Sequence, residues 1–256
     1  MKDGSSKWFV LLGAPLLLLL ALPLLALVGA VSSETLRAGL EEPAFGEALG
    51  LSLRTSLVSI VLIVAFGAPL AWSLSRLPET KARFVEVFVE LPMVLPPAVV
   101  GLGLLYAFSR RGLWGQTWGE SLAFSSTAVV LAQIVIGAPL FVQSATAAFR
   151  RVDPELLLVA RTLGQTAVGS MARVALPIAW PGLVSGIALA WARALGEFGA
   201  TLLFAGNLPG VSQTMPLAIY NALESDLDVA LALGLLLATV GGGVLLLVRL
   251  VFRGHR

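Results

Sequence analysis

Six long apolar stretches constrain this sequence more than any other feature, and they lie at 8–31, 57–74, 87–108, 128–149, 178–204 and 229–252. An α-helix rises 1.5 Å per residue, so about 20 apolar residues cross the hydrocarbon core of a membrane. Only 12% of the residues are charged, against about 25% in a typical soluble domain. The sequence therefore predicts an all-α membrane protein, a bundle of about six transmembrane helices that forms one domain over residues 1–256.

The distribution of basic residues predicts the orientation of this bundle. Most Lys and Arg residues fall in the termini and in the stretches 75–86 and 150–177, whereas Arg37, Arg54, Arg110 and Arg111 fall in the others. Because cytoplasmic loops carry the excess of Lys and Arg, we expect both termini in the cytoplasm. The first stretch also resembles a signal peptide, with Lys2 and Lys7 before it, but its apolar run is longer than such peptides have.

Several kinds of chemistry have no candidate residues in this sequence. There is no cysteine, and His255 is the single histidine. Thiolate catalysis and multi-histidine metal sites are therefore not expected, and neither is a cofactor. The three lysines, Lys2, Lys7 and Lys81, do not follow a glycine, so the G-K-[ST] core of a phosphate-binding loop is absent. A transporter of this sequence would take its energy from elsewhere.

The third apolar stretch contains the run ELPMVLPP at 90–97, followed by Gly101 and Gly103. Its three prolines remove backbone donors and must kink or interrupt a helix. Two interpretations stay open here. The run is either a packing kink or a broken helix that lines a solute path.

The fifth stretch places charge within a span. Arg193 and Glu197 are four residues apart, so on a helix they lie on one face and are close enough to pair. One interpretation is a structural ion pair, and the other is a pore or gate that includes Arg193, Glu197 and Thr201, because ionisable groups at membrane depth usually face water or a substrate route. In the second case Arg193 would offset the charge of an anion and Glu197 would prevent tight binding.

The stretch 150–177 is predicted to be a cytoplasmic loop that contains a short amphipathic helix. Asp153 is a suitable N-cap, Pro154 suits the first helical position, and Glu155 lies in the first turn. Gly164 is a typical C-terminal stop, and Pro177 closes the loop. The apolar face consists of Leu156, Val159, Ala160 and Leu163, with Arg161 directed elsewhere. This face needs a partner, which is the membrane surface, the bundle or a groove in another protein.

The same loop resembles a motif of the permease subunits of binding-protein-dependent ATP-binding-cassette importers. That motif is Glu-Ala-Ala, three residues, Gly, nine residues, Ile, one residue and Leu-Pro. Here Gly164 and the pair at 176–177 match with the right spacing, but Leu158 takes the glutamate position. The runs LPMVLPP at 91–97 and ARALGEFGATLLFAGN at 192–207 resemble molybdate permeases in particular. Sulfate and tungstate permeases have a similar fifth span.

The resemblance implies the importer permease (type I) fold in the plasma (inner) membrane of a prokaryote. It implies a homodimer surrounded by lipid, two cytoplasmic ATPase subunits and an extracytoplasmic oxyanion-binding protein, with no nucleic-acid partner. The residues that it assigns to the ATPase contact are Asp153, Glu155, Leu156, Val159, Ala160, Arg161, Leu163, Gly164 and Pro177. The permease itself is then not an enzyme.

Two other classes of protein are alternatives to this interpretation. A stand-alone secondary transporter or channel would also have broken helices and buried charge. An intramembrane enzyme is disfavoured because His255 lies in the tail and every aspartate lies in a predicted loop.

Overall fold

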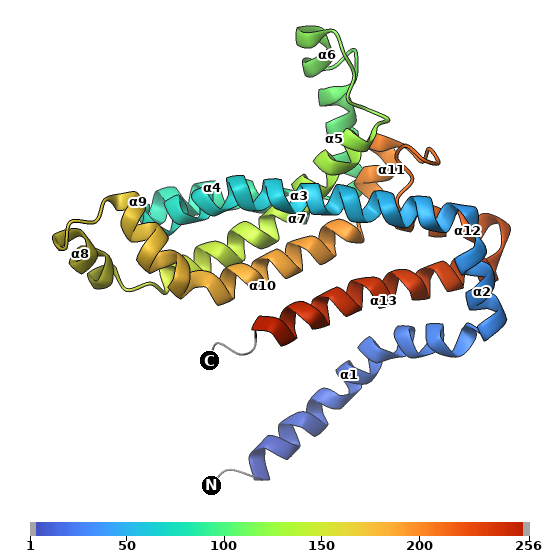
Figure 1. The fold of residues 1–256 in the computed structure, drawn as a ribbon, viewed down its shortest axis with the longest axis horizontal. Helices are drawn as coiled ribbons and strands as arrows, with labels where there is room; N and C mark the ends of the chain where they lie inside the picture. The colour runs from blue at the N-terminus through green and yellow to red at the C-terminus, as the bar shows by residue number, and fades with distance from the viewer. Residues whose placement is uncertain (1–3, 253–256) are drawn as a thin grey trace.

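The computed structural model describes residues 4–252, in which no strand occurs (Figure 1). The helices, in chain order, are α1 (Gly4–Ala30), α2 (Ser33–Glu41), α3 (Pro43–Arg76), α4 (Glu79–Val94), α5 (Pro97–Phe108), α6 (Leu113–Trp118), α7 (Ser126–Arg150), α8 (Pro154–Thr162), α9 (Ala167–Ser170), the π-helical turn η1 (Met171–Ala175), α10 (Leu176–Leu195), α11 (Gly199–Ala205), α12 (Met215–Ser225) and α13 (Leu227–Phe252). The predicted all-α fold is confirmed.

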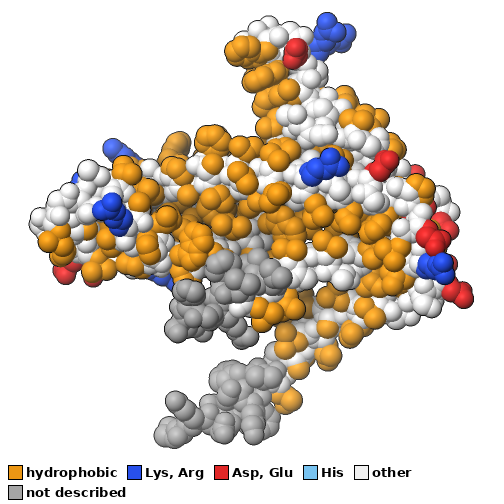
Figure 2. All heavy atoms as spheres, in the orientation of Figure 1, with side chains coloured by type: hydrophobic (Ala, Val, Ile, Leu, Met, Phe, Trp, Pro, Cys, Tyr) orange, Lys and Arg blue, Asp and Glu red, His pale blue; other side chains and the backbone are white. Residues whose placement is uncertain are grey.

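Five helical runs in the described residues are long and apolar enough to cross a membrane. A sixth candidate is the pair of segments Glu79–Val94 and Pro97–Trp118, which bends by 106° at its break. Figure 2 shows hydrophobic side chains over the flank of the molecule, whereas most charged side chains lie toward its ends. This distribution suits a bundle whose flank faces lipid.

The centre of the bundle is formed by α3, α7 and α10, which pack side by side. Phe141 and Phe149 of α7 are fully buried there with Leu74 of α3 and Leu183 of α10. Small residues allow this close approach: a methyl group added at Gly182 would lie 2.5 Å from the Ala148 side chain. Small residues are the usual means by which membrane helices approach one another closely.

Helix α3 begins at Pro43, so the stretch 32–56, which we expected to connect two spans, is largely helical. Its buried polar residues form hydrogen bonds both within the helix and to distant segments: the Thr55 hydroxyl donates to the Leu51 carbonyl at 2.9 Å. The Ser52 hydroxyl accepts from the backbone N–H of Met215 at 2.8 Å. Hydropathy did not predict the first turns of α3. Their serine and threonine hydroxyl groups lower the local hydropathy although the chain is helical there.

Two segments leave the central bundle. Helix α1 diverges from it, and its candidate span has no buried residue. Helices α5 and α6 project sideways as an arm (Figure 1). The described ends of α1 and α13 both lie below the central helices in Figure 1.

Candidate functional site

The third span is broken between α4 and α5. Helix α4 ends at Val94, Leu95 and Pro96 are extended, and Pro97 begins α5. A residue before proline disfavours the helical conformation, and neither proline can donate a backbone hydrogen bond. Of the kink and the interruption that the prolines allowed, the structure contains an interruption, and it redirects the chain by 106°.

The fifth span is also broken. Helix α10 ends at Leu195, and α11 begins at Gly199. The expectation that Arg193 and Glu197 share one continuous helix was wrong, because Glu197 lies in the non-helical link. The run of Gly196 and Gly199 around it lowers the helix propensity at this point.

Arg193 and Glu197 nevertheless form the ion pair that their spacing predicts. Arg193 Nη1 lies 2.8 Å from Glu197 Oε2, and the side chain of Glu197 is 1% exposed against 37% for Arg193. The other carboxylate oxygen, Glu197 Oε1, accepts the backbone N–H of Ala200 at 2.8 Å. Glu197 thus satisfies a donor in the first turn of α11 as well as the guanidinium group.

The two breaks meet in space. A Cβ atom added at Gly101 of α5 would lie 2.7 Å from the carbonyl oxygen of Ala200 in α11, and one added at Gly199 would lie 3.1 Å from Pro97 Cβ. Thr201 lies at this junction and is fully buried. Its hydroxyl has no hydrogen-bond partner within the described part of the chain. Discontinuous helices that meet within the membrane are where transporters place their substrate and ion sites.

The predicted amphipathic helix is present as α8. The Asp153 carboxylate accepts the backbone N–H of Glu155 at 2.9 Å, and Pro154 begins the helix. Gly164 ends the turn with φ +86°, in the left-handed region that favours glycine. The cap and the stop residue are therefore confirmed.

Most of the apolar face of α8 is not covered by the bundle. Leu156, Val159 and Leu163 are exposed, Leu163 to 78%, whereas Ala160 is buried. Leu157, which we did not assign to that face, packs against the core instead. Leu158, at the glutamate position of the motif, is exposed. Within the described chain, the bundle therefore leaves about half or more of each of these three side chains uncovered.

Pro177 does not close a loop, contrary to our expectation. Helices α9, η1 and α10 form one helical run from Ala167 to Leu195, and Pro177 lies inside it. Because proline has no N–H to donate to the carbonyl of residue 173, the preceding turn is π-helical, with Leu176 N bonded to Met171 O. Arg161 lies exposed in the last turn of α8, and Arg173 donates to the Gln165 side chain at 3.2 Å.

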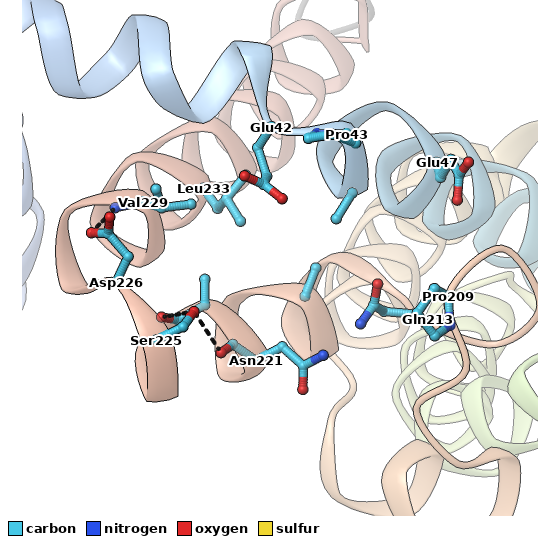
Figure 3. A pocket seen from close by; sticks show the side chains of 13 residues that line it. Glu42, Pro43, Glu47, Pro209, Gln213, Asn221, Ser225, Asp226, Val229 and Leu233 are labelled. Atoms are coloured by element: carbon cyan, nitrogen blue, oxygen red, sulfur yellow. Dashed lines mark hydrogen bonds between the residues drawn. The ribbon is translucent and has the colours of Figure 1, made fainter.

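Two pockets were missed by the sequence reasoning. One, of about 520 Å³, lies among α3, α12 and α13 at the end of the molecule away from α8, with Glu42, Glu47, Gln213, Asn221 and Asp226 in its lining (Figure 3). The carboxylate of Glu42 points into this space (Figure 3). The other, of about 250 Å³, lies between α4 and α7 and includes Glu86, Glu90 and Arg150. The spacing of Glu86 and Glu90, four residues apart, was a signal for the second pocket.

Comparison with known proteins decides the family of this chain. Residues 63–255 match the family described as binding-protein-dependent transport system inner membrane component. The chain belongs to this family. It is 43% identical over 243 residues to the molybdenum transport system permease protein ModB of Mycobacterium tuberculosis. The matched region covers 94% of this chain and 92% of that protein. It is 40% identical over 240 residues to a probable molybdenum ABC transporter permease of Haloferax volcanii, over 93% and 87% of the two chains.

Solved structures share the fold of this inner membrane component. A bacterial ABC transporter that imports the acidic polysaccharide alginate matches with a TM-score of 0.77 at 19% identity, over 98% of this chain and 97% of that one. The methionine ABC transporter MetNI matches with a TM-score of 0.67 at 18% identity, over 83% and 98%. The predicted importer permease fold is thus confirmed, as is a multi-pass protein of a prokaryotic plasma membrane.

Proposed function

We propose that this chain is the transmembrane permease subunit of an importer that carries molybdate into the cell. The observation that supports this most strongly is its 43% identity, over nearly the whole chain, to permeases named for molybdenum transport. The broken third and fifth spans fit such a role, because they bring two helix ends together at membrane depth.

Energy would come from two separate ATPase subunits bound at α8. The exposed apolar side chains of Leu156, Val159 and Leu163 support this proposal, since they need a partner that the described bundle does not supply. Closure of the ATPases around nucleotide would move α8 and switch the permease between inward-open and outward-open states. The half of the molecule with α8 is then cytoplasmic, together with both chain ends, as the basic residues indicate.

Outside the membrane, an oxyanion-binding protein would deliver the substrate to a dimer of two permease copies. The unburied helix α1 is compatible with further contacts within such a dimer. Selection among anions is best made by the binding protein, because a conduit must release what it binds.

Arg193, Glu197 and Thr201 are proposed to line the route of the anion. The partial exposure of Arg193 supports this role, because its guanidinium retains free donors beyond its bond to Glu197. Glu197 competes with a passing dianion for the same guanidinium, which keeps retention of the anion weak.

Transport in a reconstituted system tests the proposal. The permease, its ATPase and the binding protein are placed in proteoliposomes, and uptake of labelled molybdate is followed with ATP or a non-hydrolysable analogue. Uptake is expected only with ATP and binding protein, and excess tungstate or sulfate measures selectivity. Equal uptake without ATP would instead identify a secondary transporter or channel.

A further inference from the structure

The pocket between α4 and α7 contains charged and polar groups that the proposed route does not yet use. The two helices pack side by side, and the pocket of about 250 Å³ lies where α7 approaches its end at Arg150, three residues before α8 is capped by Asp153. Its polar lining consists of Glu86, Glu90, Gln143, Thr146 and Arg150.

Two donors on α7 face two carboxylates on α4. Arg150 Nη2 lies 2.6 Å from Glu86 Oε1, and Gln143 Nε2 donates to Glu90 Oε1 at 2.9 Å. The side chain of Arg150 is 46% exposed and that of Glu86 is 28% exposed. The ionic contact is therefore open on one side, where the pocket lies.

Thr146 provides an independent sign of an occupant. It is only 4% exposed and lines the pocket, yet its hydroxyl has no hydrogen-bond partner among the residues of the described chain. Buried hydroxyl groups are nearly always hydrogen-bonded to protein or to an ordered polar molecule. The hydroxyl is therefore free to bond to a polar species that enters the pocket.

The position of these groups argues for water rather than lipid on this face. Glu86 and Glu90 lie within α4, one half of the bent candidate span. Ionisable groups within spans usually face the bundle interior or a water-filled cavity. The opposite side of α4 carries the exposed apolar side chains of Phe84 and Phe88, which suit lipid or another apolar surface.

We propose that this pocket is a contact site for the transported oxyanion on the inner part of its route. The inference rests on the function proposed above. Arg150, the amide of Gln143 and the hydroxyl of Thr146 supply donors to the tetrahedral dianion. When no anion is present, Glu86 and Glu90 accept hydrogen bonds from Arg150 and Gln143. The anion has to compete with these carboxylates for the two donors, so it is held weakly. A conduit needs such weak binding.

A cation is the competing ligand, since the lining has two carboxylates for one guanidinium. Both carboxylates are already engaged by donors from α7, and Arg150 repels a cation that approaches them. The Arg193–Glu197 pair shows the same arrangement at the break between α10 and α11. In both places, a carboxylate of the protein holds the donor that an anion would use.

Thiol labelling tests this site directly, because the chain has no native cysteine. Thr146→Cys is made in the full chain, assembled with its ATPase in inside-out vesicles, and treated with the anionic reagent 2-sulfonatoethyl methanethiosulfonate. We expect labelling that molybdate slows. Adding Arg150→Gln is expected to slow labelling about tenfold. A factor of this order corresponds to the loss of one hydrogen bond between the reagent and a charged group.

The chain offers matched controls. Arg83→Gln removes a similar ion pair on the same helix, Arg83 with Glu79 at 2.8 Å, whose side chains are 73% and 83% exposed outside the pocket. It should leave labelling unchanged. Ala145→Cys, in the core beside Thr146, should stay unlabelled. Gln143→Cys is an exposed second reporter for the case that Thr146→Cys does not fold.

Three results would overturn the inference: no labelling at either reporter, the same rate with and without Arg150→Gln, or labelling that sodium slows and molybdate does not. The proposed function is tested separately by uptake with the unchanged chain. ATP-driven molybdate uptake together with any of these results removes the contact site and leaves the proposed function in place.

Discussion

Substitution of Glu197 separates its two contacts. Oε2 accepts from Arg193 at 2.8 Å, and Oε1 accepts the N–H of Ala200 at 2.8 Å. Glu197→Gln removes the charge but keeps an amide oxygen able to cap α11, whereas Glu197→Ala removes both contacts. The permease with Glu197→Gln should therefore lose only the ion pair, and the one with Glu197→Ala should also lose the cap.

The structure sets the size of the two effects. Breaking a buried ion pair costs about 3–5 kcal/mol, but Arg193 is 37% exposed, and solvent reduces the cost of its lost partner to about 1–2 kcal/mol. Loss of a helix cap adds about 1 kcal/mol. A change of 1 kcal/mol shifts Tm by about 2–4 °C in a chain of this size. We expect a fall of about 2–8 °C for Glu197→Gln and a larger one for Glu197→Ala.

Thermal unfolding of the purified permease in detergent provides the assay. Adding Arg193→Gln to Glu197→Gln should restore part of the lost stability, because no unpaired guanidinium then remains. Equal Tm values for the two Glu197 variants would show that the cap contributes nothing. A wild-type Tm for both variants would refute the account of this residue as the anchor of the broken span.

Three further predictions concern other parts of the chain. The double change of Leu156 and Leu163 to Asp should abolish co-purification of the ATPase while membrane insertion stays normal, and normal co-purification would contradict the assignment of α8. Gly101→Ala should destabilise the permease by about 1–3 kcal/mol because its methyl group meets a backbone carbonyl of α11, whereas Gly103→Ala, inside α5 with open space around it, should keep or slightly raise Tm, because alanine favours a helix more than glycine does. Arg193→Ala should lower ATP-driven molybdate uptake without preventing insertion or assembly, and wild-type uptake would return the pair to a purely structural role.

Hydropathy and local backbone chemistry account for the features that could be predicted from the sequence. Prolines at 92, 96 and 97 predicted a kink or an interruption of the third span, and the break occurs at the adjacent pair 96 and 97, where two missing donors coincide, whereas Pro92 lies inside α4. Asp153 and Gly164 predicted the limits of α8 for the same local reason. The family motif predicts that this helix contacts an ATPase, even though Leu158 departs from the motif, and that role stays a prediction.

The features that the sequence did not predict depend on contacts between distant segments. The break after Leu195 arises in a stretch whose hydropathy favours one helix, and the link is stabilised by Glu197 and by packing of α11 on α5. The pairing of Arg150 with Glu86 joins residues 64 positions apart. No local sequence pattern specifies a contact between residues so far apart. The exposure of the apolar face of α8 likewise depends on how the whole loop packs against the bundle.

The continuous run from Ala167 to Leu195 connects the two candidate sites mechanically. It contains 29 residues, so it is about 43 Å long at the usual rise per residue. Helix α8 packs against its α9 and η1 turns at one end, and the other end carries Arg193 immediately before the break. The π-helical turn and the prolines at 177 and 181 are points where this run can bend, and the non-helical link at 196–198 and the extended Leu95 can change direction. An ATPase that moved α8 would therefore act through this run on α11, which packs on α5 where Gly101 leaves no room for a side chain, and would alter the junction at which the anion is proposed to pass.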